Sequence, residues 1–183
     1  LYFNNGNIYD GEYKEGKRDG NGRMICANGN TFEGIFVNGK LNGKGKYIYK
    51  GILKYDGFFK DAKYEGKGIY YHSNGDKYTG DFKDNKKNGW GIMEYNDGSK
   101  YEGEFKNDKK NGKGIKYFKG GNIYEGDFVD NEFHGNGIIN YKNGDKYIGD
   151  FSHGHIEGKG MMIFNVGKKY IGQFKNGKFD GNG

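Results

Sequence analysis

Proline is absent from this sequence, and cysteine, serine and threonine are scarce. The single cysteine, Cys26, excludes an intrachain disulfide framework and fits a reducing compartment. No apolar run approaches the roughly 18 residues of a membrane-spanning helix. Hydrophobic residues make up only 33% of the chain, so a core of aliphatic layers is excluded as well. We therefore expect a cytoplasmic protein with an unusual source of burial.

Glycine and aromatic residues supply what the aliphatic residues do not, with 37 Gly, 17 Tyr and 14 Phe. An aromatic-x-Gly-x-aromatic phrase returns in strict register, and a Gly-x-Gly pair follows each phrase. The phrases begin at residues 9, 32, 55, 78, 101, 124, 147 and 170. Such a period marks stacked identical units. We expect residues 9–183 to form eight repeats, the last truncated, and residues 1–8 to end a preceding repeat of a longer array.

Each repeat can be numbered from its leading aromatic residue as position 1. Positions 1, 3 and 5 share one face of a strand, because side chains alternate between faces. Positions 2 and 4 are largely acidic, as in Glu102 and Glu104, and position 6 is often Lys. One face therefore stacks rings and the other carries charges. Glycines at positions 3 and 14 leave space for neighbouring rings to lie over bare backbone.

The turn residues predict how the strands connect. Positions 20 and 21 read Asn28-Gly29, Asn74-Gly75 or Asn143-Gly144, which favours a two-residue hairpin turn. The second strand then begins near position 14, and positions 7–13 form a longer loop. Gly51 falls at position 20, so the turn before Tyr55 should differ. The expected fold is all-β: an elongated single-layer antiparallel meander of β-hairpin repeats, twisted into a solenoid-like rod.

The phrase Tyr101-Glu-Gly103-Glu-Phe105, followed by Asn111-Gly112-Lys-Gly114, resembles the MORN repeat, the membrane occupation and recognition nexus motif. This resemblance covers nearly the whole chain. It implies a single-layer twisted β-sheet with an architectural or targeting role. The heavy use of Asn and Lys is similar to that of cytoskeletal MORN proteins of parasitic protists, which help to organise the basal complex and cell division.

No residues with the pattern of a catalytic site stand out. Ser152 adjoins His153, but neighbours on a strand point to opposite faces, which argues against a nucleophile-base pair. The carboxylates recur in every repeat, whereas catalytic carboxylates would sit in unlike surroundings. The Gly-x-Gly pairs lead into no helix and no Lys-Ser/Thr follows, which excludes a nucleotide loop. We expect no enzyme activity, no catalytic residues and no cofactor.

Three histidines, His134, His153 and His155, fall in two successive loops of the expected fold. They could contribute to a structural zinc site, completed by a second chain at a dimer interface. The simpler interpretation is three solvated loop histidines, and this one we favour.

Two binding surfaces compete. The net charge of +6 and the Lys-rich loops favour weak contact with anionic phospholipids through Lys86, Lys87, Lys109, Lys110 and Lys113. These charges are spread out and lie near acidic residues, so they do not sum into one patch. Nucleic acid is a poor candidate, because rings and lysines lie on opposite faces.

The second surface is a row of apolar residues in the C-terminal repeats. Position 10 is Phe133, Ile156 and Phe179 there, on an expected loop edge, and Phe128, Phe151 and Phe174 accompany them on the ring face. Exposed apolar rows mark interfaces, which predicts a homodimer; the alternative is that these side chains cover their own rings. Our hypothesis is a non-enzymatic scaffold that organises cytoskeletal assemblies beneath a membrane. The alternatives are a lipid-binding targeting module or the targeting module of a larger enzyme.

Overall fold

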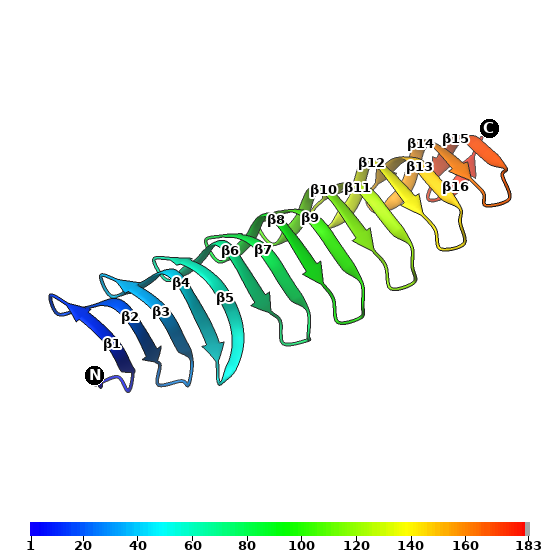
Figure 1. Cartoon of the computed structure of the whole chain (residues 1–183). Coiled ribbons are helices and arrows are strands. Elements are labelled where there is room, and N and C mark those ends of the chain that lie inside the picture. The colour runs from blue at the N-terminus through cyan, green and yellow to red at the C-terminus, as the bar shows by residue number, and fades with distance from the viewer. Residues whose placement is uncertain (182–183) are drawn as a thin grey trace. The chain divides into compact units, whose positions relative to one another are not determined.

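The computed structural model describes residues 1–181 and contains β-strands and no helix in that range (Figure 1). Accordingly, the described residues include no helix long and apolar enough to cross a membrane. The strands are β1 Ile8–Lys14, β2 Lys17–Ile25, β3 Thr31–Val37, β4 Lys40–Tyr49, β5 Ile52–Lys60, β6 Lys63–Tyr71, β7 Lys77–Lys83, β8 Lys86–Glu94, β9 Lys100–Lys106, β10 Lys109–Tyr117, β11 Ile123–Val129, β12 Glu132–Asn140, β13 Lys146–Ser152, β14 His155–Ile163, β15 Lys169–Lys175 and β16 Lys178–Asp180.

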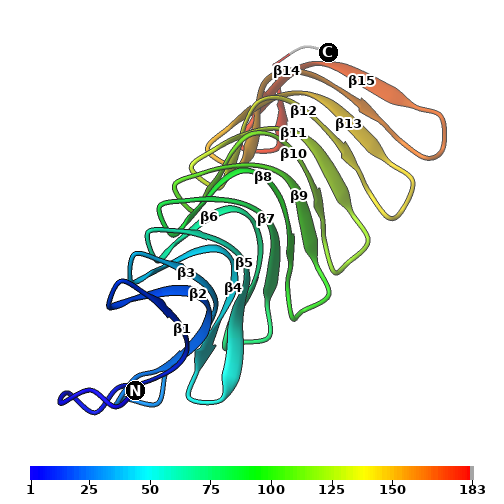
Figure 2. The same ribbon diagram turned by 60° about the vertical axis from the view of Figure 1, so that its left-hand side comes forward.

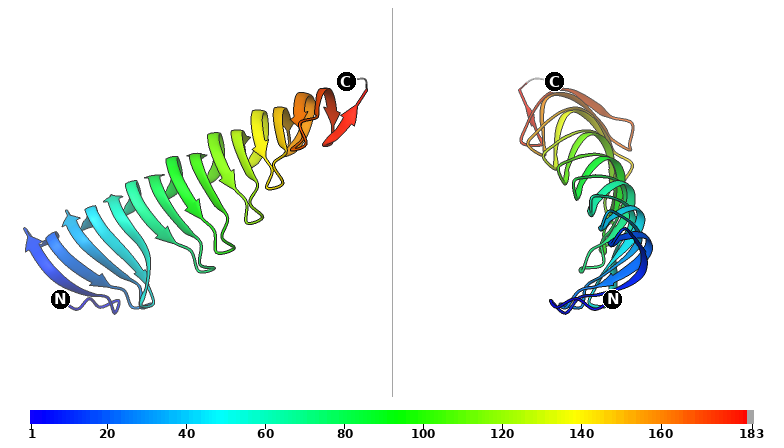
Figure 3. Two further views of the ribbon diagram at one scale, coloured as in Figure 1. Left: turned by 45° about the vertical axis from the view of Figure 1, so that its right-hand side comes forward. Right: turned by 90° about the vertical axis from the view of Figure 1, so that its left-hand side faces the viewer.

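All these strands belong to one open antiparallel sheet, in which each strand neighbours those before and after it in the chain. The predicted hairpin meander is therefore confirmed. By their contacts the residues divide into two compact units, Leu1–Gly89 and Trp90–Gly183, which we call the N-terminal and C-terminal units. Within each unit the strands form one layer of hairpins (Figure 3).

The prediction of the turns was wrong, because the short and long connections are exchanged. The two-residue turn lies at positions 7 and 8: Lys14 pairs with Lys17 across Glu15 and Gly16. Glu15 and Gly16 have φ of 50° and 75°, and positive φ at both central residues is what a type I′ hairpin requires. The second strand thus begins at position 9, and position 10 lies inside it rather than in a loop.

The Asn-Gly pairs occupy the longer connection instead. In the loop after β6, the Asn74 side chain accepts a hydrogen bond from the Asp76 backbone N–H at 3.1 Å. The His72 N–H donates to the Asp76 carbonyl at 2.9 Å and closes the loop. This Asx-type bond stabilises a turn two residues long within a wider loop, so Asn-Gly alone could not define the loop length.

The turn before Tyr55 does differ, as the sequence predicts. Tyr49 at the end of β4 pairs directly with Ile52 at the start of β5. Lys50 and Gly51 form a two-residue turn there, with φ of 47° and 84°. This repeat therefore has tight turns at both ends.

Tyrosine rings lying over glycines form the core. Tyr101 is fully buried, and a Cβ built on Gly114 would stand 2.5 Å from its hydroxyl oxygen. The hydroxyl donates to the Glu104 carbonyl at 2.9 Å, three residues along the same strand. The corresponding tyrosines make the same bond at 2.8–3.3 Å, namely Tyr9, Tyr55, Tyr78, Tyr124, Tyr147 and Tyr170. The glycines are thus required by the rings, as predicted.

The strands bend at these glycines toward the rings. Tyr55 and Phe59 lie four residues apart on β5, a span of about 13 Å in a straight strand. Their ring centroids are nevertheless only 5.1 Å apart, edge to face, and Figure 2 shows the strands curving. Phe82 of the next repeat also packs edge to face with Tyr55, with centroids 5.1 Å apart. Tyr55 therefore contacts a phenylalanine of its own repeat and one of the next, and so do Tyr124 and Tyr147.

One repeat lacks this arrangement and shows what the hydroxyl does. Phe32 stands at position 1, has no hydroxyl to bond the backbone, and is only half-buried. It stacks on Tyr47 with centroids 4.9 Å apart. Leu41 fills the place over the glycines and is 2% exposed.

Candidate binding groove

A line of paired glycines crosses the sheet. In the C-terminal unit, Gly114 pairs with Gly103 on one side and Gly126 on the other, and Gly137, Gly149, Gly160 and Gly172 continue the line. The tyrosine rings cover this line on one face, the aromatic face. On the other, the outer face, the line presents only strand backbone between the side chains of positions 2 and 15 and those of positions 4 and 13, and it forms the floor of a groove.

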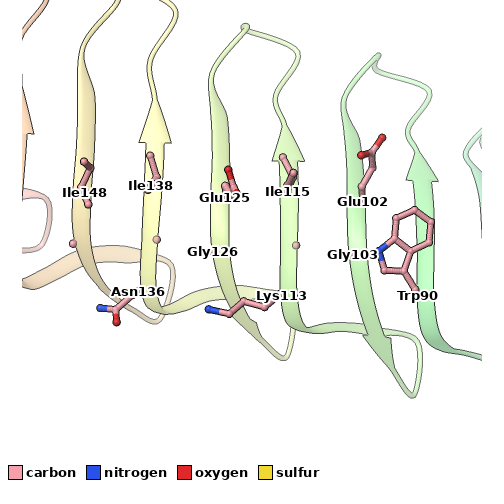
Figure 4. Close-up of a pocket in the computed structure, with 13 residues that line it drawn as sticks. Trp90, Glu102, Gly103, Lys113, Ile115, Glu125, Gly126, Asn136, Ile138 and Ile148 are labelled. Carbon is pink, nitrogen blue, oxygen red and sulfur yellow. The ribbon is translucent and has the colours of Figure 1, made fainter.

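The groove in the C-terminal unit has a volume of about 680 Å³ and crosses β8 to β13. Figure 4 shows its side chains. Its lining consists of Trp90, Glu102, Gly103, Lys113, Gly114, Ile115, Glu125, Gly126, Asn136, Gly137, Ile138, Ile148 and Gly149. It is therefore long, open and mostly apolar.

One wall of the groove is a row of positions 2 and 15, which we call the upper row. Register places Ile115 beside Glu125, Glu125 beside Ile138, and Ile138 beside Ile148. Met161 and Ile171 extend the row across β14 and β15. Ile115, Ile138 and Ile148 are half-buried, and Ile171 is 58% exposed. Aligned aliphatic side chains on a solvent-facing sheet surface mark a contact surface.

The opposite wall is a row of positions 4 and 13, the lower row, and it is polar. Lys113 forms a 2.6 Å ion pair with Asp127. Asn136 donates from Nδ2 to Asp150 at 2.6 Å. Trp90 lies at the same repeat position on β8 and is 48% exposed. In Figure 4, Lys113 and Asn136 lie on the other side of the glycines from the isoleucines.

The groove has the properties of a binding surface. Its side chains can bury apolar groups, accept hydrogen bonds at carboxylates and stack on an indole ring. Among residues 1–181 there is no group of three or more His, Cys, Asp or Glu placed to hold a metal ion. Two of the carboxylates beside the groove are bonded to lysines of the sheet, Glu102 to Lys100 and Asp127 to Lys113.

The apolar residues assigned from sequence to a dimer interface pack within the chain. Phe128, Phe151 and Phe174 are 2–4% exposed, and Ile156 is 9% exposed. Phe133 stacks on Tyr124 with ring centroids 3.8 Å apart. Phe179 is 53% exposed and lies over Tyr170 at 4.2 Å. Position 10 thus covers the tyrosine of its own repeat, and this accounts for its apolar character without a second chain.

The lysines assigned to lipid contact are mostly engaged elsewhere. Lys87 and Lys110 also occupy position 10, with ammonium groups 5.6 Å from the Tyr78 ring and 5.4 Å from the Tyr101 ring. Lys109 pairs with Asp130 at 3.0 Å. Lys113 belongs to the lower row of the groove, and Lys86 begins β8. These side chains form no common patch.

The three histidines lie on neighbouring elements: His134 in β12, His153 in the turn between β13 and β14, and His155 at the start of β14. The His134 and His153 rings are 5.8 Å apart, edge to face. His153 Nδ1 lies 3.4 Å from a Glu132 carboxylate oxygen, and His155 is exposed. The sequence correctly brings them to neighbouring strands, but the expected loop placement is wrong for His134 and His155, which lie in β12 and β14.

Sequence reasoning missed the groove. It treated positions 2 and 4 as largely acidic and the outer face as charged, and along the upper row that holds mainly in the N-terminal unit, where Arg23, Glu33, Lys46 and Asp56 stand. The signal was present in the replacement of charged residues by Ile148, Ile138 and Met161 at positions 2 and 15 of the later repeats. Because those substitutions change neither the period nor the glycines, they do not disturb the repeat pattern.

Solved structures with a similar fold include two domains of known proteins. One is the TCP domain of SAS-4 (dCPAP) from Drosophila melanogaster, in complex with a proline-rich motif of Ana2 (dSTIL). It is 19% identical, covering 84% of this chain and 83% of that one with a TM-score of 0.51. Another is the wild-type TCP10 domain of Danio rerio CPAP with a peptide of STIL, 12% identical, covering 94% and 76% with a TM-score of 0.54. At these identities the likeness concerns the fold alone.

The repeats themselves identify the family. No curated protein matches the chain. The MORN repeat, however, matches residues 9–31, 32–51, 55–77, 78–100, 101–123, 124–146, 147–169 and 170–183. The second match stops at the tight turn before Tyr55, where the structure departs from the other repeats. The chain therefore belongs to the MORN-repeat family.

Proposed function

We propose that this chain is a non-enzymatic protein-binding scaffold, and that the groove of the C-terminal unit holds a segment of a partner protein. The observation that carries the proposal is the alignment of Ile115, Ile138 and Ile148 beside a glycine floor. Fully burying one such side chain contributes about 1.5–3 kcal/mol. Covering the half-exposed row would supply several kcal/mol in all, which is enough to drive weak association.

The similar structures support a peptide as the occupant. Both were solved with a segment of another protein, a proline-rich motif in one and a STIL peptide in the other. These two complexes support a peptide segment as the occupant of the groove proposed here. The cytoskeletal setting beneath a membrane and the role in cell division that the family resemblance implies form part of the same proposal.

Homodimerisation through the C-terminal repeats is a second candidate, supported by Phe179, which is 53% exposed at the last described strand. Light scattering tests it: Phe179→Asp should convert a dimer to a monomer, while Phe133→Asp should unfold its repeat, because that ring stacks on Tyr124. A dimer that survives Phe179→Asp would remove this surface from the proposal.

The lipid-binding alternative has less support, because Lys109 and Lys113 are ion-paired within the sheet. Binding to anionic vesicles that is lost at high salt and on changing Lys86 and Lys109 to Glu would favour it over a protein scaffold.

The direct test of the scaffold is selection of peptides from a random display library on the folded chain. The negative variant is Ile138→Asp with Ile148→Asp, and the matched control is Ile69→Asp, at the same repeat position on β6 outside the groove. Selected peptides should bind the native chain and the control but not the double variant. Enrichment of nothing, or of peptides that bind all three proteins equally, would contradict the proposal.

A further inference from the structure

The direction of the groove limits the backbone conformation of its occupant. The groove runs across β8 to β13 rather than along a strand. Its floor consists of strands whose backbone groups already pair with their neighbours, as Gly114 does between Gly103 and Gly126. A segment in the groove therefore gains no ladder of backbone hydrogen bonds. The polyproline II conformation needs none, because its backbone stays solvated and its stiffness reduces the entropy lost on binding.

The length of the groove sets the length of the segment. From β8 to β13 there are five strand spacings, which amount to about 24 Å. At about 3.1 Å per residue, a polyproline II segment of about eight residues covers this distance. Its apolar side chains can rest on Ile115, Ile138 and Ile148, which line one wall.

The charge of the groove limits the sequence of its occupant. The two rows contain five carboxylates, Glu102, Glu104, Glu125, Asp127 and Asp150, against Lys113 and Lys159. Glu102 is paired with Lys100, and Asp127 with Lys113. Glu125 is exposed between Ile115 and Ile138, and it forms no ion pair within the part of the chain that the structure describes. An apolar segment with a cation at this point complements the groove.

We infer that the groove binds a proline-containing segment of about eight residues that places aliphatic side chains on Ile115, Ile138 and Ile148 and a Lys or Arg on Glu125. The inference rests on the proposed function and specifies its partner. It also disfavours a second copy of this chain, since two such grooves facing each other would bring their excess carboxylates together.

The probes are three fluorescein-labelled peptides, measured by fluorescence anisotropy on the whole chain. The first is Pro-Leu-Pro-Leu-Pro-Lys-Pro-Leu-Pro-Leu; the second has Glu in place of Lys; the third has Ser in place of every Leu. The protein variants are Glu125→Lys and Ile138→Ser. Their matched controls are Glu33→Lys and Ile69→Ser, which occupy the same repeat positions in the N-terminal unit. Circular dichroism checks that each variant is folded.

We expect the lysine peptide to bind the native chain about tenfold more tightly than the glutamate peptide, and the serine peptide to bind least. The Glu125→Lys variant should bind the glutamate peptide more tightly than the lysine peptide. The Ile138→Ser variant should bind the lysine peptide about tenfold more weakly than the native chain does. Both controls should leave the affinities unchanged.

Several outcomes would overturn the inference. If the native chain binds the two charged peptides equally, or if Glu125→Lys still prefers the lysine peptide, the occupant has no cation at Glu125. An equal loss in Ile69→Ser would move the site away from the groove. Binding of phosphatidylserine vesicles, or a dimer in light scattering, that is lost in Ile138→Ser would identify a membrane or a second copy as the occupant. If display selects groove-dependent peptides without basic residues, the scaffold function is supported and only the inferred sequence of the partner is wrong. If neither experiment finds a groove-dependent peptide, both the scaffold function and the inferred partner are wrong.

Discussion

The two units of the chain share one face and differ in the other. On the aromatic face, Tyr55 and Tyr101 are equally buried, and each donates its hydroxyl to a backbone carbonyl three residues on. On the outer face, the upper row of the N-terminal unit pairs Arg23 with Glu33 at 3.1 Å and Lys46 with Asp56 at 3.8 Å. The same row in the C-terminal unit is mostly aliphatic.

This comparison separates stability from recognition. The aromatic face supplies the burial that holds the strands together, and it tolerates little change. The outer face contributes little, since exposed ion pairs are worth only about 0–1 kcal/mol. Its residues are therefore free to specialise. If this is right, the units are alike in stability and unlike in binding.

The largest effect should come from removing a buried phenylalanine in either unit. Phe82→Ala and Phe128→Ala each delete a ring that is 5% or less exposed and packs on tyrosines of two repeats. Each should lower the free energy of unfolding by about 3–5 kcal/mol. Urea unfolding measures both. If one variant loses less than half as much free energy of unfolding as the other, the aromatic faces of the two units are not equivalent.

Replacing a glycine of the line by alanine should lower the free energy of unfolding by a smaller amount. In both Gly68→Ala and Gly114→Ala the Cβ would stand 2.5 Å from a tyrosine ring, and overpacking of this kind costs about 1–3 kcal/mol. Gly120→Ala is the control, because nothing lies within 4 Å of its Cβ. If the control loses as much stability as the other two variants, these positions require glycine for its backbone flexibility and not for its contact with the ring.

High pH should weaken both units together. Burial raises the pKa of Tyr147 to about 12, and it raises the pKa values of Tyr55 and Tyr101 as well. A tyrosine whose pKa is raised in the folded state stabilises that state fully below its unfolded pKa of about 10, and the contribution is lost as pH rises through the folded value. The free energy of unfolding should therefore be flat from about pH 7 to 9 and fall above about pH 10. Ionisation of these tyrosines without unfolding would contradict their burial.

The smallest change in stability should accompany the largest change in binding. Lys46→Ile with Asp56→Ile gives the N-terminal unit an aliphatic pair beside Ile69, at positions that are cross-strand neighbours. The free energy of unfolding should shift by no more than about 0.5 kcal/mol. The chain should bind a second equivalent of the lysine-containing proline peptide, because a second groove is created. No new binding would indicate that Trp90, which has no counterpart there, is required as well.

Sequence alone predicted the antiparallel meander and the two faces of its strands, because the period and the glycines fix them, but it placed the start of each second strand too late. Tyr101 and Gly114 could be assigned to one face from spacing, and the structure places them in contact. The turns could not be predicted, because Asn-Gly suits both a two-residue turn and an Asx-stabilised longer loop, and positions 7 and 8 contain Asp, Asn and His as well as Gly. The groove depends on the residues that flank each glycine on the outer face. These residues are charged in some repeats and aliphatic in others, and a consensus over all repeats conceals that difference.

The order of the strands has an evolutionary consequence. Every described strand pairs only with the strands next to it in sequence, so strand pairing never joins distant repeats and folding can begin at any hairpin. Duplication or loss of one repeat adds or removes two strands and leaves every other register intact. Recombination between repeats can therefore lengthen or shorten the outer groove in steps of about 10 Å. Such a chain can change the length of the segment that it recognises without redesigning its core.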